Sequence, residues 1–137
     1  MEQPLRIGII GTSFVSDWIC GAAKETTACE IAAVYSREEA RARAYAEKAC
    51  IPLAFSDLEA FLSSPAIDAV YVASPNASHY RQTLLALEHG KHVLCEKPLA
   101  INAAQAARMI SFAHETGLVL LEAIRPVYDP FLTKLKE

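Results

Sequence analysis

Short apolar segments alternate with longer amphipathic segments along almost the whole chain, and this alternation restricts the possible fold more than any other feature. The apolar segments are rich in Val, Ile, Leu and Ala and lack polar alternation, which is typical of strands buried on both faces. Six strands are expected, at residues 5–10, 30–35, 53–55, 68–73, 92–95 and 118–121. Strands that alternate with helices form parallel, right-handed crossovers. The sequence therefore predicts an α/β fold, a Rossmann-type, doubly wound and mainly parallel six-stranded sheet with helices on both faces.

Several helix ends are marked by residues that cap helices. Ser36 and Ser56 are each followed three residues later by a glutamate, so both are predicted to be the N-caps of capping boxes. Asn102 is predicted to begin the last long helix and Gly117 to end it. After residue 123 the pattern changes, and residues 131–137 resemble the first turns of a new helix.

The turn after the first strand has the position of a phosphate-binding turn. Of the three glycines in the G-x-G-x-x-G pattern only Gly11 is present, and Ser13 and Ser16 take the other two places. Serine is small enough for both places, and its hydroxyl can donate to a phosphate. Such a turn presents backbone N–H groups and a positive helix end to a diphosphate. The alternative is an ordinary strand–helix turn with Ser13 or Ser16 as N-cap.

The end of the second strand favours NADP over NAD. An acidic residue there would bind the ribose hydroxyls and repel a 2′-phosphate. This chain instead has Ser36 and Arg37, a hydroxyl and a guanidinium suited to a 2′-phosphate. Glu38 and Glu39 would partly offset the positive charge. In the alternative reading Ser36 only caps a helix and Arg37 is solvated, so NAD stays possible.

Two further turns follow the fourth and fifth strands, Ser74-Pro75-Asn76 and Glu96-Lys97-Pro98. Both lie at carboxyl ends of parallel strands, where open α/β sheets bind their ligands. Lys97 is the candidate catalytic residue, because an ammonium beside the cofactor can donate a hydrogen bond to a substrate hydroxyl or carbonyl. The alternative is an exposed charged turn without chemistry, with His79 merely starting a helix.

Charge and cysteine spacing disfavour several other classes of function. The net charge is −3 and the basic residues are scattered, which argues against nucleic-acid binding as the main role. No apolar stretch reaches the roughly 20 residues of a membrane span, and we expect no signal peptide. The four cysteines lack metal-ligand spacing, so we expect reduced, mostly buried thiols, no metal site and a cytoplasmic protein.

Taken together, these segments resemble the family of glucose–fructose oxidoreductase and inositol 2-dehydrogenase, known as Gfo/Idh/MocA. The resembling segments are Arg6-Ile7-Gly8-Ile9-Ile10-Gly11-Thr12, Ser36-Arg37, Ser74-Pro75-Asn76 with His79, Cys95-Glu96-Lys97-Pro98 and Leu121-Glu122-Ala123. The resemblance implies an oxidoreductase that transfers hydride to or from a sugar, polyol or related carbonyl compound. It also implies that residues 1–123 form the NAD(P)-binding domain and that residues 124–137 begin a truncated substrate domain.

Site residues follow from the same resemblance. The implied cofactor-binding residues are Gly11, Thr12, Ser13, Phe14, Ser36, Arg37, Ser74, Pro75, Asn76, His79, Glu96 and Lys97. The phosphates would lie at residues 11–13, the adenosine ribose at 36–37, the middle of the cofactor at 74–79 and the nicotinamide ribose at 96–97. In the family the second domain supplies the other acid–base residues and usually mediates oligomerisation. We therefore expect this chain alone to be an inactive fragment of a homo-oligomeric enzyme.

Two other functions remain open on the sequence. In the first, the domain is a non-catalytic NAD(P)-binding module or sensor. In the second it is a methyltransferase that binds S-adenosylmethionine, a class that also has a glycine turn after its first strand. That class favours an acidic residue at the end of the second strand and leaves Glu96-Lys97-Pro98 unexplained.

Overall fold

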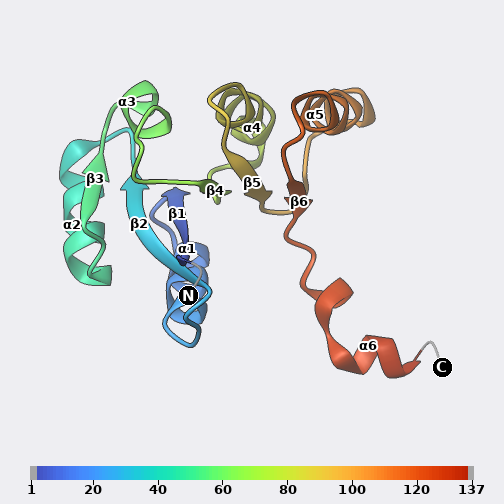
Figure 1. Ribbon diagram of the computed structural model, residues 1–137, viewed down its shortest axis with the longest axis horizontal. Helices are drawn as coiled ribbons and strands as arrows, with labels where there is room; N and C mark the ends of the chain where they lie inside the picture. The colour runs from blue at the N-terminus through green and yellow to red at the C-terminus, as the bar shows by residue number, and fades with distance from the viewer. Residues whose placement is uncertain (1–2, 136–137) are drawn as a thin grey trace.

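A six-stranded parallel sheet forms the centre of the computed structural model, which describes residues 3–135 (Figure 1). The strand order is β3-β2-β1-β4-β5-β6, and every neighbouring pair is parallel. The strands are β1 (Leu5–Ile10), β2 (Cys29–Tyr35), β3 (Leu53–Phe55), β4 (Ala69–Val72), β5 (His92–Cys95) and β6 (Leu120–Glu122). This order confirms the predicted Rossmann-type fold. The chain reverses its direction of travel across the sheet between β1 and β4, and open α/β sheets bind their ligands outside the carboxyl ends of the strands at such a point.

Helices cover both faces of the sheet. They are α1 (Phe14–Ala23), α2 (Glu39–Ala49), α3 (Leu58–Leu62), α4 (His79–Glu88), α5 (Ala103–Thr116) and α6 (Pro130–Leu135), with 3-10 turns η1 (Asn76–Ser78) and η2 (Arg125–Tyr128). Figure 1 shows α1 and α2 on one face and α3, α4 and α5 on the other. The segment after β6 leaves the sheet and leads to α6. Of the helix predicted over residues 131–137, residues 136 and 137 lie outside the described residues.

Two apolar cores lie on opposite faces of the sheet. On one face Phe61 of α3 and Leu87 of α4 are buried among side chains of β1, β4 and β5. On the other face Tyr45 of α2 and Cys20 of α1 pack against β1 and β2. A Cβ atom at Gly8 would lie 2.6 Å from the Phe61 ring, so this glycine allows α3 to approach β1 closely.

Two predicted helix caps are wrong, and the reason is local. The Ser36 hydroxyl accepts from the Glu38 N–H at 3.4 Å, which forms a separate turn and lets α2 begin later. At α3 the N-cap is Asp57 rather than Ser56, because its carboxylate accepts from the Ala60 N–H at 2.7 Å. A negatively charged acceptor also interacts favourably with the positive end of a helix. The predicted cap of α5 is confirmed, since the Asn102 side chain accepts from the Gln105 N–H at 2.9 Å.

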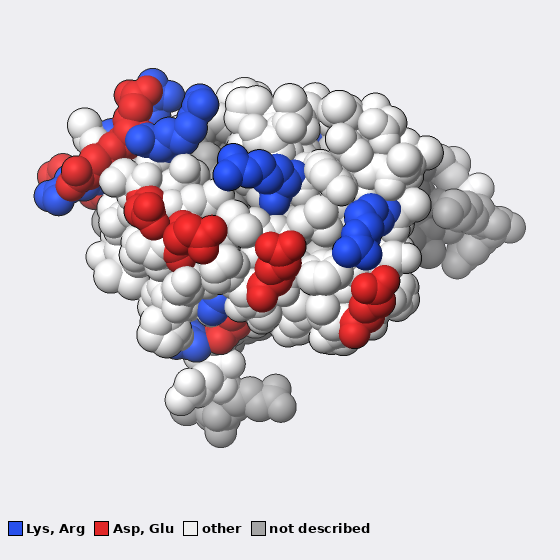
Figure 2. All heavy atoms as spheres, turned by 90° about the horizontal axis from the view of Figure 1, so that it is seen from above, with Lys and Arg blue, Asp and Glu red and all other residues white. Residues whose placement is uncertain are grey.

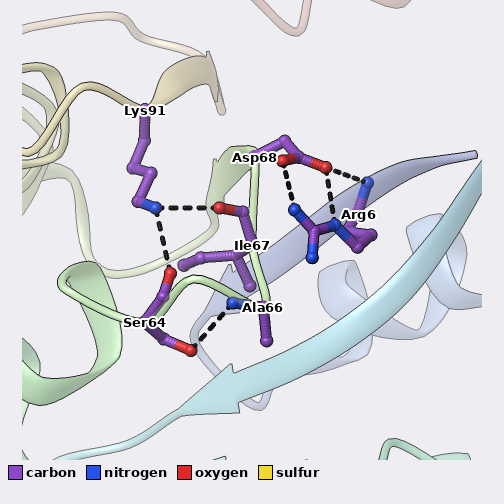
Figure 3. A network of polar contacts seen from close by, with 6 residues as sticks. All are labelled: Arg6, Ser64, Ala66, Ile67, Asp68 and Lys91. Atoms are coloured by element: carbon purple, nitrogen blue, oxygen red, sulfur yellow. Dashed lines mark hydrogen bonds and ion pairs between the residues drawn. The ribbon is translucent and has the colours of Figure 1, made fainter. Parts of the chain in front are cut away.

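A network of polar contacts joins β1 to the segments before β4 and β5 at the amino edge of the sheet (Figure 3). The Arg6 guanidinium donates to both carboxylate oxygens of Asp68, at 2.9 and 2.7 Å. These hydrogen bonds lower the pKa of Asp68 to about 2. The Lys91 ammonium donates to the carbonyl oxygens of Ser64 and Ile67 at 3.0 and 2.8 Å, and its partial burial lowers the pKa of this lysine.

The surface carries mixed charges. Acidic and basic side chains are interspersed over the face formed by α3, α4 and α5, and Lys and Arg gather into no single patch there (Figure 2). Within residues 3–135 no helix combines the length and the apolar character needed to cross a membrane. Among the same residues, no group of three or more His, Cys, Asp or Glu side chains has the arrangement of a metal site.

All four cysteines are free thiols. Cys20 and Cys95 are buried, Cys29 is half-buried and Cys50 is exposed, so the expected burial holds for two of the four.

Candidate functional site

Four turns gather the predicted site residues at one edge of the sheet. Because all strands are parallel, the residues that follow β1, β2, β4 and β5 lie along the same carboxyl edge. These turns contain residues 11–13, 36–37, 74–76 and 96–98. The sequence thus placed them correctly relative to the fold.

Gly11 is the residue that the first turn requires. Its φ of +118° is a conformation that side-chain-bearing residues rarely adopt. A Cβ atom there would also lie 2.6 Å from the carbonyl oxygen of Ala73, at the end of β4. The Gly11 N–H donates to the Tyr35 carbonyl at 3.1 Å, which anchors the turn to the end of β2.

The two serines of this turn have different roles. Ser16 is fully buried, and its hydroxyl donates to the Gly11 carbonyl at 3.0 Å. The expectation that Ser16 can donate to a phosphate is therefore wrong, since its hydroxyl holds the turn against α1. Ser13 is exposed at the N-cap position of α1, and its hydroxyl makes no capping hydrogen bond among the described residues. Thr12 is half-buried, and Phe14 is 66% exposed.

The guanidinium of Arg37 lies exposed beside two carboxylates that are already paired. Glu38 forms an ion pair with Arg41 at 3.4 Å, and Glu39 accepts from the Arg43 Nε at 2.9 Å. Among the described side chains no carboxylate pairs with Arg37. Glu38 and Glu39 therefore offset the positive charge of Arg37 less than the sequence alone indicates. The N–H of the preceding Ser36 donates to the Phe55 carbonyl at 3.1 Å, which fixes the start of this turn.

The loop that carries Lys97 follows β5 and is held by side chains of the two neighbouring strands, β4 and β6. The Tyr71 hydroxyl of β4 donates to the Glu96 carboxylate at 2.6 Å. On the other side, the Leu99 N–H donates to the Glu122 carboxylate of β6 at 2.7 Å. Burial, with the Glu96 hydrogen bond as a second cause, raises the pKa of Tyr71. The Lys97–Pro98 peptide is cis, and the Lys97 side chain is exposed on this fixed loop.

His79 joins two of the turns. Its ring is fully buried at the start of α4, with Nε2 2.9 Å from the Ser74 carbonyl and Nδ1 2.9 Å from the Pro98 carbonyl. Each ring nitrogen therefore lies within hydrogen-bonding distance of one turn carbonyl, and the buried ring links the two turns. The contact of His79 with the cofactor stays a prediction.

The other turn residues keep open surfaces. Pro75 and Asn76 are exposed, and the Ser74 hydroxyl donates to the side-chain oxygen of Gln82 on α4. Sequence reasoning missed Tyr71 and Glu122. The available signal was a polar group within, or at the end of, an otherwise apolar strand, where a buried polar atom needs a partner.

A hollow of about 840 Å³ lies at the opposite, amino edge of the sheet, where Lys24, Thr27, Cys29 and Glu30 are among its lining residues. None of the predicted site residues lines it. We place the candidate site at the carboxyl edge instead, because ligands of open parallel sheets bind outside the carboxyl ends of the strands.

Comparisons with known proteins agree with the fold. Residues 5–123 match the family described as an oxidoreductase family with an NAD-binding Rossmann fold. The scyllo-inositol 2-dehydrogenase (NADP(+)) IolU of Bacillus subtilis is 44% identical over 133 residues, which are 97% of this chain and 40% of that protein. This chain therefore spans less than half the length of that relative.

Solved structures give the same result. An NAD binding oxidoreductase from Klebsiella pneumoniae superposes with a TM-score of 0.93 at 29% identity, covering 98% of this chain and 38% of that one. The 3-ketoreductase KijD10 from Actinomadura kijaniata, solved with NADP and TDP-benzene, superposes with a TM-score of 0.89 at 33% identity. That match covers 96% of this chain and 41% of KijD10.

Proposed function

Because the chain belongs to the Gfo/Idh/MocA family of oxidoreductases, we propose that it is the NADP-binding domain of an enzyme that transfers hydride to or from a sugar, polyol or related carbonyl compound. The observation that carries this proposal is the carboxyl edge itself. A glycine turn, an Arg37 without a paired carboxylate and a fixed loop bearing Lys97 follow parallel strands of one sheet and lie along its carboxyl edge. The relatives named as NADP(+)-dependent support the choice of cofactor.

Each turn has a defined part in the proposed site. The N–H groups of residues 12–14, at the positive end of α1, bind the diphosphate. Ser36 and Arg37 bind the 2′-phosphate through charge-assisted hydrogen bonds. The exposed surfaces of Pro75 and Asn76 contact the middle of the cofactor. The contact between the His79 ring and the Ser74 carbonyl holds that turn in place.

Lys97 is the proposed catalytic residue. A nicotinamide cofactor supplies the hydride or accepts it when bound. Lys97 donates a hydrogen bond to the substrate oxygen and moves its proton, while Glu96, fixed by Tyr71, orients the nicotinamide ribose. The substrate class, the cytoplasmic location and assembly into a homo-oligomer belong to the whole protein and are proposed with it.

Calorimetric titration with NADPH and NADH in phosphate-free buffer tests the cofactor assignment. We expect Arg37→Ala to weaken NADPH binding by about 10-fold or more and to leave NADH binding unchanged, since one charge-assisted hydrogen bond is lost. Arg43→Ala is the matched control, because it removes a neighbouring arginine that is paired with Glu39. Equal losses for both cofactors would contradict the role of Arg37, and no binding of either cofactor to the unaltered chain would contradict the proposed function.

A further inference from the structure

The guanidinium of Arg125 lies over the indole ring of Trp18, 3.9 Å from the ring centroid. Trp18 belongs to α1 and is 50% exposed, and its ring contacts that of Phe14 edge-to-face with centroids 5.3 Å apart. Arg125 follows β6 at the start of η2. The contact therefore joins the helix that begins at the phosphate turn to the segment that leaves the far strand, beside the candidate site.

Arg125 differs from the other cations that lie over aromatic rings. Lys48 lies over Tyr45 and also pairs with Asp17 at 3.2 Å. Arg108 lies over Phe112 and also pairs with Glu115. Among the side chains that the structure describes, no carboxylate forms an ion pair with Arg125.

The Arg108 contact is a useful reference. Its ring partner lies four residues away on the same helix, and its carboxylate partner is 3.6 Å distant. Both interactions are typical of a helix surface. The Arg125 contact joins residues 107 positions apart, so the fold has to bring the two side chains together.

Arg125 also lies close to the residues around Lys97. The Ala123 N–H, two residues before Arg125, donates to the Cys95 carbonyl at 2.8 Å, at the start of the loop that carries Lys97. Lys97 and Arg125 are the two cations at this end of the site, beside the carboxylates of Glu96 and Glu122. Both carboxylates already accept hydrogen bonds, from the Tyr71 hydroxyl and the Leu99 N–H. A guanidinium in such a place suits an anionic ligand, because its planar N–H edge matches a carboxylate or a phosphate.

We infer that Arg125, held flat on Trp18, binds an anionic group, a carboxylate or a phosphate, in the half of the site next to Glu96 and Lys97. Stacking uses the face of the guanidinium and leaves its N–H edge free for two parallel hydrogen bonds to such a group. The inference rests on the proposed function and deepens it. The anionic group belongs either to an acidic sugar or polyol substrate or to the cofactor diphosphate.

The single tryptophan of the chain gives a direct readout. Trp18 fluorescence is followed while the chain is titrated with gluconate, with its neutral analogue glucitol and with NADPH. We expect gluconate to bind more tightly than glucitol. Arg125→Gln should weaken gluconate binding by about 10-fold or more, since a charge-assisted hydrogen bond is lost. Calorimetry on the same samples gives dissociation constants that do not depend on the altered surroundings of the indole.

Two further variants sharpen the test. Arg108→Gln removes the stacked but ion-paired arginine and should leave gluconate binding unchanged. Arg125→Lys keeps the charge without the planar group and should recover only part of the affinity.

The outcomes separate the two sources of the anion. A loss confined to gluconate assigns Arg125 to an acidic substrate, and a loss confined to NADPH assigns it to the cofactor diphosphate. Unchanged affinity of Arg125→Gln for both ligands would overturn the inference. If NADPH does not bind the unaltered chain, the proposed function fails, whereas the comparison of gluconate with glucitol still tests Arg125.

Discussion

At Gly11 the backbone conformation, the packing against β4 and the proposed diphosphate site depend on the same atoms. Gly11→Ala should lower stability by at least about 2 kcal/mol, because a Cβ is unfavourable at positive φ and would overlap the Ala73 carbonyl. It should also weaken NADPH binding, since relief of the overlap moves the turn. Chemical denaturation and calorimetry measure the two effects.

Gly21→Ala is the matched control for this substitution. Gly21 lies within α1, and a Cβ atom there would meet nothing within 4 Å. Alanine is favoured over glycine inside a helix by up to about 1 kcal/mol, so this variant should be slightly more stable and bind NADPH normally. Equal losses in the two variants would contradict the role given to Gly11.

Site residues were predictable from the sequence where they directly follow a strand, because that alone puts them at the carboxyl edge of the sheet. Gly11 and Lys97 each follow a strand directly, so the strand pattern alone puts them at the carboxyl edge. Tyr71 and Glu122 were not predicted, because their partners lie 25 and 23 residues away along the chain. The sequence marks each of them only as a polar group in, or at the end of, an apolar strand, and the packing of neighbouring strands decides which partner it meets.

At the scale of elements, the caps decide where helices begin. Asp57→Ala should destabilise the protein by about 1 kcal/mol, because α3 loses the carboxylate that accepts from the Ala60 N–H. Ser56→Ala should have little effect, although the sequence pattern favoured Ser56 as the cap. Urea denaturation of both variants measures the difference, and a larger loss in Ser56→Ala would contradict the observed cap.

Strand positions were better predicted than helix starts. The bounds of β1, β3 and β5 agree with the apolar segments. At β1 and β5 most residues are at least half-buried, which leaves a continuous apolar signal, whereas β3 is an edge strand with Leu53 and Ala54 exposed. At β6 the strand begins two residues later than predicted. The Val119 N–H donates to the His92 side chain at 3.0 Å, an alternative partner that delays the regular ladder. Helix starts failed for a similar reason, because several polar residues compete for the same N–H groups.

At the scale of the whole molecule, the Arg6–Asp68 ion pair links stability to pH. The folded pKa of Asp68, about 2, lies below its ordinary value of 3.8, so the unfolded chain takes up the proton first. The stabilisation is therefore complete above about pH 4 and is lost as the pH falls toward about 2. Thermal unfolding of the unaltered chain and of Asp68→Asn should differ most near neutral pH and converge near pH 2. A gap that stays constant over this range would contradict the assignment.

The two ends of the parallel sheet carry different tasks. The charged network of Arg6, Asp68 and Lys91 fastens the amino edge, and the ligand turns occupy the carboxyl edge. The turns at the carboxyl edge can therefore change in sequence, and with them the ligand that is bound, while the fold stays the same. Random variation at residues 36–39 should yield clones that exchange one dinucleotide for the other and melt at nearly the parental temperature. The same amount of variation around residues 64–68 should yield few folded clones of any preference.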